Sequence, residues 1–243
     1  MKVILILFSS FSFAITSDFH VGKFDRCLPD DGKCLDQAIE KAIKYSCKKG
    51  IQELKIPKLD PIEIPQINIG TKANVLDVAQ EYSDVKLVGY SKVAIINSRF
   101  NTKENHLVFT AVLPELKQIA NYNIKGRLLV FPIFGNGKCR ITQSNVTVIH
   151  TLQFENLDDG HLILKSYDVS VKPKNMKFEF ENLFNGNKLL SDRIHGVVND
   201  NWEAIWADSK KDFDEAYGRI FYGFASEFFQ KIPAADVFLK FPS

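Results

Sequence analysis

The side chains in this sequence that could carry out catalysis or bind a metal are few and widely spaced. Residues 89–93 read Gly-Tyr-Ser-Lys-Val, half of a Gly-x-Ser-x-Gly nucleophile elbow, but valine replaces the second glycine and no strand-to-helix turn is predicted there. The five histidines fall at no metal-binding spacing such as His-x-x-x-His. Gly135-x-Gly137 is not followed by a helix, which argues against a phosphate-binding loop. We therefore expect no enzymatic activity, no cofactor and no metal ion.

Bulky apolar side chains gather instead in the stretch from Asn187 to Ile232. They recur every three or four residues, so that one apolar stripe follows one face of an α-helix. Asn187 is typical of an N-cap, and Lys231 followed by Pro233 ends the helix. Unbroken, this helix would be about 65 Å long, whereas a compact globule of this size is about 45 Å across. We therefore expect either a break at the weak helix formers 199–201 or a protein elongated around the helix.

The same stretch is rich in aromatic rings. They belong to Trp202, Trp206, Phe213, Tyr217, Phe221, Phe224, Phe228 and Phe229. Such a stripe commonly just fills a core, but Gly218 and Gly223 stand inside the predicted helix despite a cost of about 1 kcal/mol each relative to alanine. They leave room for a sheet or a ligand, so a packed and a hollow interior both stay open. The charged face, residues 208–215, is expected to be solvated, with Lys211 and Glu215 paired.

The preceding part of the chain is predicted to be mostly β-structure, after a short amphipathic helix from Cys34 to Cys47. The expected strands cover 62–69, 75–78, 85–88, 93–98, 106–113, 116–122, 128–134, 138–154, 162–171 and 176–180. Gly135-Asn136-Gly137 is a strong hairpin signal. Because the strands follow one another rather than alternating with helices, we expect antiparallel hairpins and not a parallel nucleotide-binding sheet. The fold class is therefore α+β, a long curved antiparallel sheet wrapped around a long C-terminal helix.

The N-terminus and the composition bound the class of protein. Residues 1–17 hold Lys2, a short apolar run and small residues, which is typical of a secretory signal peptide cleaved near Ala14 to Ser17. The run is too short for a membrane span. No linker or repeat divides residues 18–243, so we expect one domain. The formal net charge of +2 argues against a nucleic-acid partner.

Cysteines and one sequon suggest covalent modifications. Four cysteines in a secreted chain allow two disulfides. Cys27 and Cys34 flank a turn-rich loop that can bring them together. Cys47 and Cys139 either form a second bridge or are two free thiols, and the sequence does not decide between these alternatives. Residues 145–147, Asn-Val-Thr, form an N-glycosylation sequon on a predicted strand that turns Asn145 to solvent. We expect a glycan at Asn145, with an unused sequon as the alternative.

An ordered series of short motifs resembles the insect takeout and juvenile hormone-binding proteins. It covers nearly the whole mature chain and consists of Cys27 and Cys34 before the first helix, 50–51, 59–61, 113–114, 122–127, 135–137, 145–146, 182–187, 201–202 and 232–233. The resemblance implies a curved sheet around a long helix, an internal tunnel for a lipophilic ligand, and transport in haemolymph or chemosensory fluid. The long helix lacks the cysteine that carries the second disulfide of the hormone-binding branch, so the chain is more similar to the takeout branch.

These observations predict a secreted, non-enzymatic carrier of a hydrophobic small molecule such as a terpenoid or fatty acid. Strand parity and the helical stripe select the expected lining residues, which are Leu107, Phe109, Phe131, Phe178, Phe180, Trp202, Trp206, Phe213, Tyr217 and Phe224. Tyr122 or His195 is expected to anchor a polar head group. No stable membrane insertion is expected, and a cell-surface receptor stays open as a partner.

Two other function classes compete with the carrier. The alternative is a lipid-transfer or membrane-surface module that exchanges lipid with bilayers, which needs an exposed apolar or cationic tip. The third is an esterase that acts on the carried ligand, and the incomplete nucleophile elbow argues against it.

Overall fold

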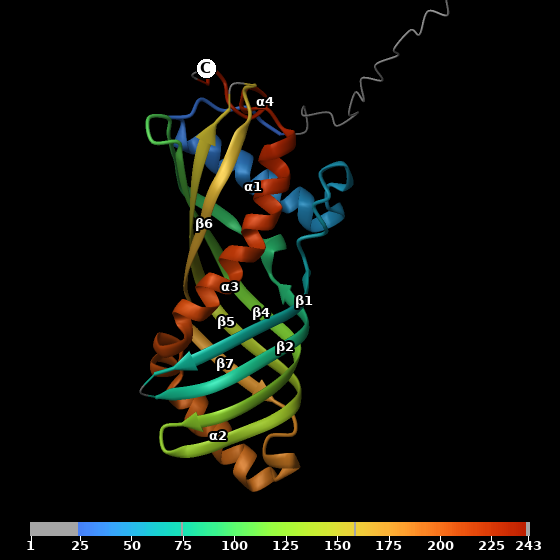
Figure 1. The fold of residues 1–243 in the computed structure, drawn as a ribbon, viewed down its shortest axis with the longest axis vertical. Coiled ribbons are helices and arrows are strands. Elements are labelled where there is room, and N and C mark those ends of the chain that lie inside the picture. The colour runs from blue at the N-terminus through green and yellow to red at the C-terminus, as the bar shows by residue number, and fades with distance from the viewer. Residues whose placement is uncertain (1–23, 74, 158, 242–243) are drawn as a thin grey trace, which may run out of the picture.

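The computed structural model describes residues 24–73, 75–157 and 159–241, so the predicted signal peptide lies outside the described residues. The molecule is elongated, and a curled sheet wraps around one long helix (Figure 1). The helices and strands, in chain order, are α1 (Gly32–Lys49), η2 (Gln52–Leu54), β1 (Ile62–Lys72), β2 (Leu76–Val88), η3 (Tyr90–Lys92), β3 (Ala94–Asn101), β4 (His106–Leu128), β5 (Phe131–Asn156), β6 (Leu162–Lys172), β7 (Asn175–Phe180), η4 (Phe184–Gly186), α2 (Lys188–Asp200), α3 (Trp202–Lys231) and α4 (Ala234–Val237).

Within the described residues, seven strands form one antiparallel sheet. Its order is β1-β2-β4-β5-β6, with β3 also pairing with β4 and β7 with β5. The long strands β4 and β5 pair continuously from His106 opposite Gln153 to Leu128 opposite Phe131. Alternate residues of each strand are buried, as the pleat of a half-buried sheet requires. The predicted fold class and the antiparallel hairpins are therefore confirmed, although the strands expected at 106–113 and 116–122 are one continuous strand.

The long helix both breaks and runs along an elongated protein. Asn201 separates α2 from α3, and its side-chain amide donates a hydrogen bond of 2.8 Å to the carbonyl of Val197. Asn187 caps α2 by accepting from the backbone N–H of Leu190, as predicted. In Figure 1, α3 crosses the open side of the sheet, α2 lies at one end of the molecule, and α1 lies at the other.

The charged face of α3 does more than contact solvent. The carboxylate of Asp212 accepts a hydrogen bond of 2.8 Å from the hydroxyl of Thr71 in β1, and Asp214 accepts one of 3.0 Å from the backbone N–H of Val171 in β6. These strands, β1 and β6, are the two ends of the main sheet order, and the bond at β6 gives a partner to a backbone N–H of an edge strand. The aspartates therefore fasten the helix to both edges, and the expectation of a merely solvated face is wrong. Lys211 and Glu215 do pair, at 3.9 Å.

The predicted hairpin at Gly135-Asn136-Gly137 is also wrong. These residues lie inside β5, and the chain turns at Leu129 and Val130 instead. A Cβ atom at Gly135 would lie 2.9 Å from the Cα atom of Leu183. The glycine therefore permits the segment after β7 to cross β5 closely, and in a local sequence pattern such a glycine looks the same as a turn glycine.

One disulfide joins Cys27 to Cys34, as predicted. Cys47 and Cys139 are buried free thiols, so the second bridge does not form. Burial raises the pKa of each of these two thiols to about 12, and both stay protonated and unreactive at neutral pH. Asn145 is exposed on β5, while its glycosylation stays a prediction.

Candidate ligand cavity

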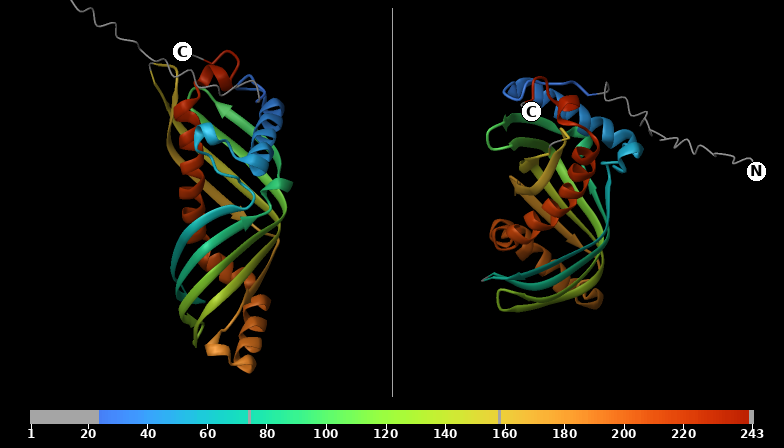
Figure 2. Two further views of the ribbon diagram at one scale, coloured as in Figure 1. Left: turned by 90° about the vertical axis from the view of Figure 1, so that its right-hand side faces the viewer. Right: turned by 45° about the horizontal axis from the view of Figure 1, so that its top comes forward.

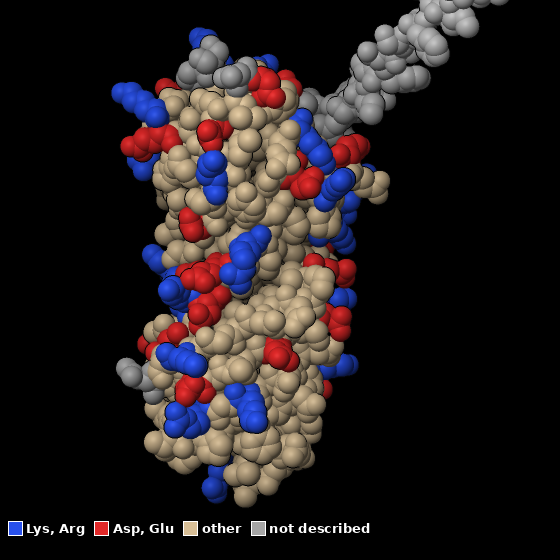
Figure 3. Space-filling view, in the orientation of Figure 1, with Lys and Arg blue, Asp and Glu red and all other residues tan. Residues whose placement is uncertain are grey.

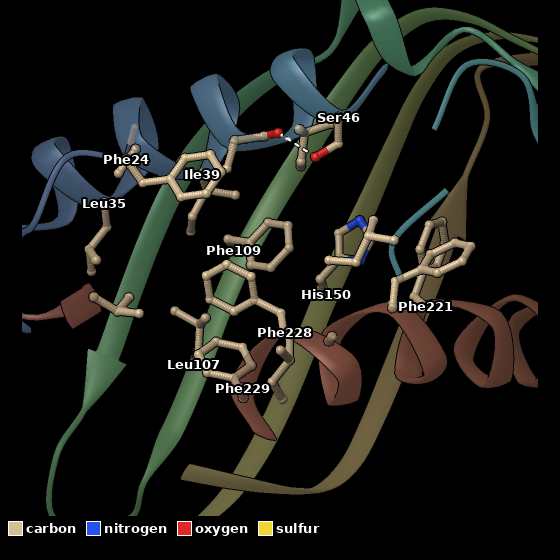
Figure 4. Close-up of a pocket in the computed structure, with 18 of the residues that line it drawn as sticks. Phe24, Leu35, Ile39, Ser46, Leu107, Phe109, His150, Phe221, Phe228 and Phe229 are labelled. Carbon is tan, nitrogen blue, oxygen red and sulfur yellow. Dashed lines mark hydrogen bonds between the residues drawn. The ribbon is translucent and has the colours of Figure 1, made fainter. Parts of the chain in front are cut away.

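An apolar cavity of about 230 Å³ lies at the α1 end of the molecule. Its walls are α1, the C-terminal part of α3, and strands β4 and β5 (Figure 4). The lining consists mostly of aliphatic and aromatic side chains: Phe24, Asp25, Cys27, Leu35, Ala38, Ile39, Ala42, Ile43, Ser46, Ile51, Ile56, Leu59, Ile62, Tyr90, Leu107, Phe109, His150, Leu152, Tyr167, Phe221, Phe224, Ala225, Phe228, Phe229, Asp236, Val237 and Phe238.

Helix α1 supplies one wall because its apolar residues repeat at helical spacing. Leu35, Ala38, Ile39, Ala42 and Ile43 all face the cavity. Acids beside this apolar face hold the helix on the sheet, since the N–H groups of two β3 residues donate to α1 carboxylates at 2.8 and 3.1 Å. The two pairs are Ser98 with Asp36 and Ile95 with Glu40. The disulfide fixes the start of α1 to the preceding segment.

Helix α3 supplies the facing wall through rings three or four residues apart. Phe221, Phe224 and Phe228 line the cavity, and Phe229 packs edge-on against Phe154 of β5 with 4.6 Å between ring centroids. Phe228 also contacts Phe24, at 6.2 Å between centroids. The rings thus bridge α3, the sheet and the segment before α1.

Two polar side chains interrupt the apolar lining on the sheet side. Nδ1 of His150 lies 2.9 Å from the hydroxyl oxygen of Tyr167. The imidazole stacks on Phe109 with 4.5 Å between centroids, and Phe221 meets it edge-on at 5.4 Å. Figure 4 shows His150 between these two rings. Burial lowers the pKa of His150 to about 3, so the imidazole is neutral at physiological pH.

The cavity reaches the surface beside the segment that precedes α1. Asp25 belongs to the lining and is exposed, where it pairs with Lys41 of α1 at 3.0 Å. Asp236 of α4 is half-buried and also belongs to the lining. We therefore identify this rim as the mouth of the cavity.

Three of the twelve predicted ligand-binding residues lie at this cavity: Leu107, Phe109 and Phe224. Three others, Trp206, Phe213 and Tyr217, are buried in the middle of α3 and pack against each other. They fill the interior instead of lining the cavity because the helix lies directly on the sheet at this level. Trp202, at the start of α3, packs against the edge of the same core.

The remaining five lie toward the α2 end. Phe131 is 56% exposed because the chain turns just before it. Phe178, Phe180 and His195 border a shallow surface groove between β7 and α2. The backbone N–H of Phe180 donates to Nε2 of His195 at 2.9 Å, and the hydroxyl of Tyr122 donates to the carbonyl of Glu181 at 2.6 Å. Both expected anchors are therefore occupied by backbone groups.

Sequence reasoning misses most of the cavity wall. The residues of α1 form a predicted amphipathic helix, but nothing in the pattern assigns its apolar face to a site. His150 stands on the inward parity of β5, between Val148 and Leu152, and that position is the available signal. Nothing comparable marks Tyr167, because its side chain reaches the cavity from β6, whose position beside α3 is a tertiary property.

Neither a metal site nor a membrane span emerges from the described residues. No three His, Cys, Asp or Glu side chains in these ranges gather as metal ligands would. Of the helices described, none has the length and apolar composition needed to cross a membrane.

Comparisons with known proteins agree with this architecture. A family model described as haemolymph juvenile hormone binding protein (JHBP) matches residues 3–239. Circadian clock-controlled protein daywake of Drosophila melanogaster is 30% identical over 226 residues, covering 88% of this chain and 86% of that protein. Daywake of Drosophila yakuba is 27% identical over 224 residues, with the same coverage. The crystal structure of Epiphyas postvittana Takeout 1 shares the fold, with a TM-score of 0.79, 24% identity, and coverage of 88% of this chain and 98% of that one.

Proposed function

This chain belongs to the haemolymph juvenile hormone binding protein family, and we propose that it is a secreted carrier of one hydrophobic small molecule, such as a terpenoid, fatty acid or similar lipid. The observation that carries the proposal is the apolar cavity between α1 and α3. The name of the family supports it, since that name refers to hormone binding in haemolymph.

Apolar burial would drive binding. Each Å² of ligand surface removed from water contributes about 25 cal/mol before the cost of ordering is subtracted. Pockets for drug-sized molecules commonly measure about 300–1,000 Å³, whereas this cavity measures about 230 Å³. It therefore suits a small or slender lipid.

Filling the cavity should abolish binding while leaving the fold intact. Ala225 of α3 lines the cavity, and Ala204 of the same helix is exposed and lies outside it. We expect Ala225→Phe to lose displacement of the fluorescent probe N-phenyl-1-naphthylamine by dodecanol, and the matched control Ala204→Phe to retain it. Native mass spectrometry of protein from the culture medium should show an adduct that organic extraction removes. Equal binding by both variants would contradict the carrier function at this site.

Secretion has a separate test. Full-length protein expressed in insect cells should appear in the medium with its N-terminus near Ala14 to Ser17. Retention in the cells with Met1 intact would contradict secretion, whatever the outcome of the binding assay.

One observation favours the membrane-surface alternative as a second candidate function. Leu129 is 51% exposed and Val130 80% exposed at the β4–β5 turn, and Leu189 is 64% exposed at the start of α2. Both segments lie at the end opposite α1 (Figures 1 and 2), where the face shown in Figure 3 carries few charged side chains. Exposed apolar side chains at one end can enter the headgroup region of a bilayer.

Vesicle flotation tests this candidate. With phosphatidylcholine vesicles, the native protein should float, and Val130→Glu/Leu189→Glu should not, because a charge in the headgroup–acyl boundary is costly. Leu28→Glu, at an exposed leucine near the cavity end, is the matched control and should float like the native protein. If the native protein stays at the bottom of the gradient, only the soluble carrier function is left.

A further inference from the structure

One residue of the cavity lining carries a buried polar atom that has no partner among the described residues. His150 is 2% exposed, and its Nε2 atom has no hydrogen-bond partner in the part of the chain that the structure describes. Leaving a polar group unpaired in an apolar site is unfavourable. Among the hydroxyls of the lining, that of Ser46 donates to the carbonyl of Ala42 at 2.9 Å and that of Tyr167 contacts His150.

The pairing with Tyr167 fixes which proton the free nitrogen carries. If Nδ1 of His150 donated to the phenol oxygen, the hydroxyl hydrogen and Nε2 would both need partners elsewhere. If the hydroxyl donates to Nδ1, only the Nε2–H group is left without one. The second arrangement leaves fewer unsatisfied groups, so Nε2 is a hydrogen-bond donor on a residue of the cavity wall.

The surroundings of Nε2 also indicate the charge of the ligand group that accepts its hydrogen bond. The described lining residues include no lysine or arginine. At the mouth, the lining acids are Asp25, which is paired with exposed Lys41 of α1, and Asp236. A carboxylate beside His150 would be buried without a cation, which is far more costly than burying a neutral oxygen. A carbonyl or hydroxyl oxygen pays no such penalty.

We propose that Nε2–H of His150, held by Tyr167, is the polar anchor of the cavity and that the carried molecule presents a neutral carbonyl or hydroxyl oxygen to it. This proposal rests on the proposed carrier function. The rings of Phe109 and Phe221 contact the imidazole from two sides and fix its orientation.

A cycle of ligands and variants tests the anchor in the full chain. The affinities of 2-decanone, decane and decanoate are measured by displacement of N-phenyl-1-naphthylamine. His150→Phe/Tyr167→Phe removes both polar partners together and leaves no orphaned hydroxyl. We expect the ratio of Kd for 2-decanone to Kd for decane to rise about tenfold in this variant, because decane does not use the donor. The native protein should bind decanoate more weakly than 2-decanone at pH 8.

Tyr217→Phe is the matched control, since Tyr217 is a buried tyrosine outside the cavity whose hydroxyl donates to Gln118. It should leave the ratio unchanged. An unchanged ratio in the double variant, or an equal rise in Tyr217→Phe, would overturn the anchor while the carrier function stands. Failure of the native protein to bind any of the three ligands would overturn the carrier function and the anchor with it.

A second measurement does not depend on folding of a variant. In the native protein, the ¹⁵N resonance of His150 should report an Nε2–H tautomer whose shift changes with 2-decanone and not with decane. An Nδ1–H tautomer, or equal shifts with both ligands, would contradict the proposal.

Discussion

The middle of α3 and its C-terminal part meet the same sheet in different ways. In the middle, the ring of Phe213 lies 5.7 Å from that of Trp206, 6.0 Å from Tyr217 and 6.3 Å from Tyr82, and all four are buried. In the C-terminal part, rings of the same kind face a cavity. Ring content is therefore similar along the stripe, and only its surroundings decide whether the rings fill or line the interior.

Two features set that difference. A Cβ atom at Gly218 would lie 2.9 Å from the carbonyl oxygen of Tyr167, so the helix approaches β6 closely at this point. Beyond it, α1 forms the wall opposite α3 (Figure 4) and stands on the edge of β3 through Asp36 and Glu40. Because α1 lies opposite the C-terminal part of α3, the rings of α3 do not fill the space between the two helices.

Truncating one ring in the middle of α3 and one in its C-terminal part should give the largest difference between an effect on stability and an effect on ligand binding. Phe213→Ala removes a buried ring, and we expect it to lower the free energy of unfolding by about 3–5 kcal/mol. Phe228→Ala removes a half-buried ring that already borders the cavity, so about 1–2 kcal/mol is expected, together with altered probe affinity. Urea unfolding followed by tryptophan fluorescence measures both. Equal losses would mean that the two regions are packed alike.

Acid should weaken the cavity region through His150. Its pKa is about 3 in the folded protein and about 6.5 when unfolded, so the unfolded chain binds the extra proton between these values. Stability is then retained above pH 6.5 and falls by about 1.4 kcal/mol per pH unit as the pH drops toward 3. The difference in unfolding free energy between the native protein and His150→Phe/Tyr167→Phe should show this slope. Parallel pH profiles would contradict a buried neutral imidazole.

Two glycines of α3 should respond with opposite signs. Gly218→Ala places a methyl group against the β6 backbone and should cost about 1–2 kcal/mol. Gly223 is exposed, and a Cβ atom added there would meet nothing within 4 Å, so Gly223→Ala should stabilise by about 0.5–1 kcal/mol through helix propensity. Thermal unfolding checks both. Stabilisation by Gly218→Ala would mean that position 218 does not need a glycine for the close approach of α3 to β6.

The smallest expected effect concerns the polar contact in the packed region. The hydroxyl of Tyr217 donates to Oε1 of buried Gln118 at 2.9 Å. Tyr217→Phe should cost about 1 kcal/mol of unfolding free energy and leave ligand affinity unchanged. A change in affinity would extend the binding site into the middle of the helix.

Much of the fold is accessible from sequence because it rests on local patterns. The stripe of the long helix, its weak point at Asn201 and the alternation in β7 each depend on residues close in the chain. The site is less accessible, because parity tells which face is inward but not what lies opposite. Phe109 and Phe213 are equally inward by pattern, and only the position of α1 separates a wall residue from a filling residue.

Two glycines also show that the local sequence does not identify the tertiary neighbours of a residue. Gly135 and Gly218 both permit close backbone approach, one to Leu183 and one to Tyr167. The first resembles a turn glycine when read locally, and the partner that it accommodates is far away in the chain. Tertiary neighbours, not neighbouring residues, decide the role of such positions.

A hydrophobic ligand should lie between α1 and the C-terminal part of α3, and not along the middle of that helix. A crystal of the full mature chain soaked with 1-bromodecane tests it through the anomalous signal of bromine. We predict a peak inside the space bounded by Ile39, Phe109 and Phe228. A peak beside Trp206 and Phe213, or no ordered bromine within the protein, would contradict the account.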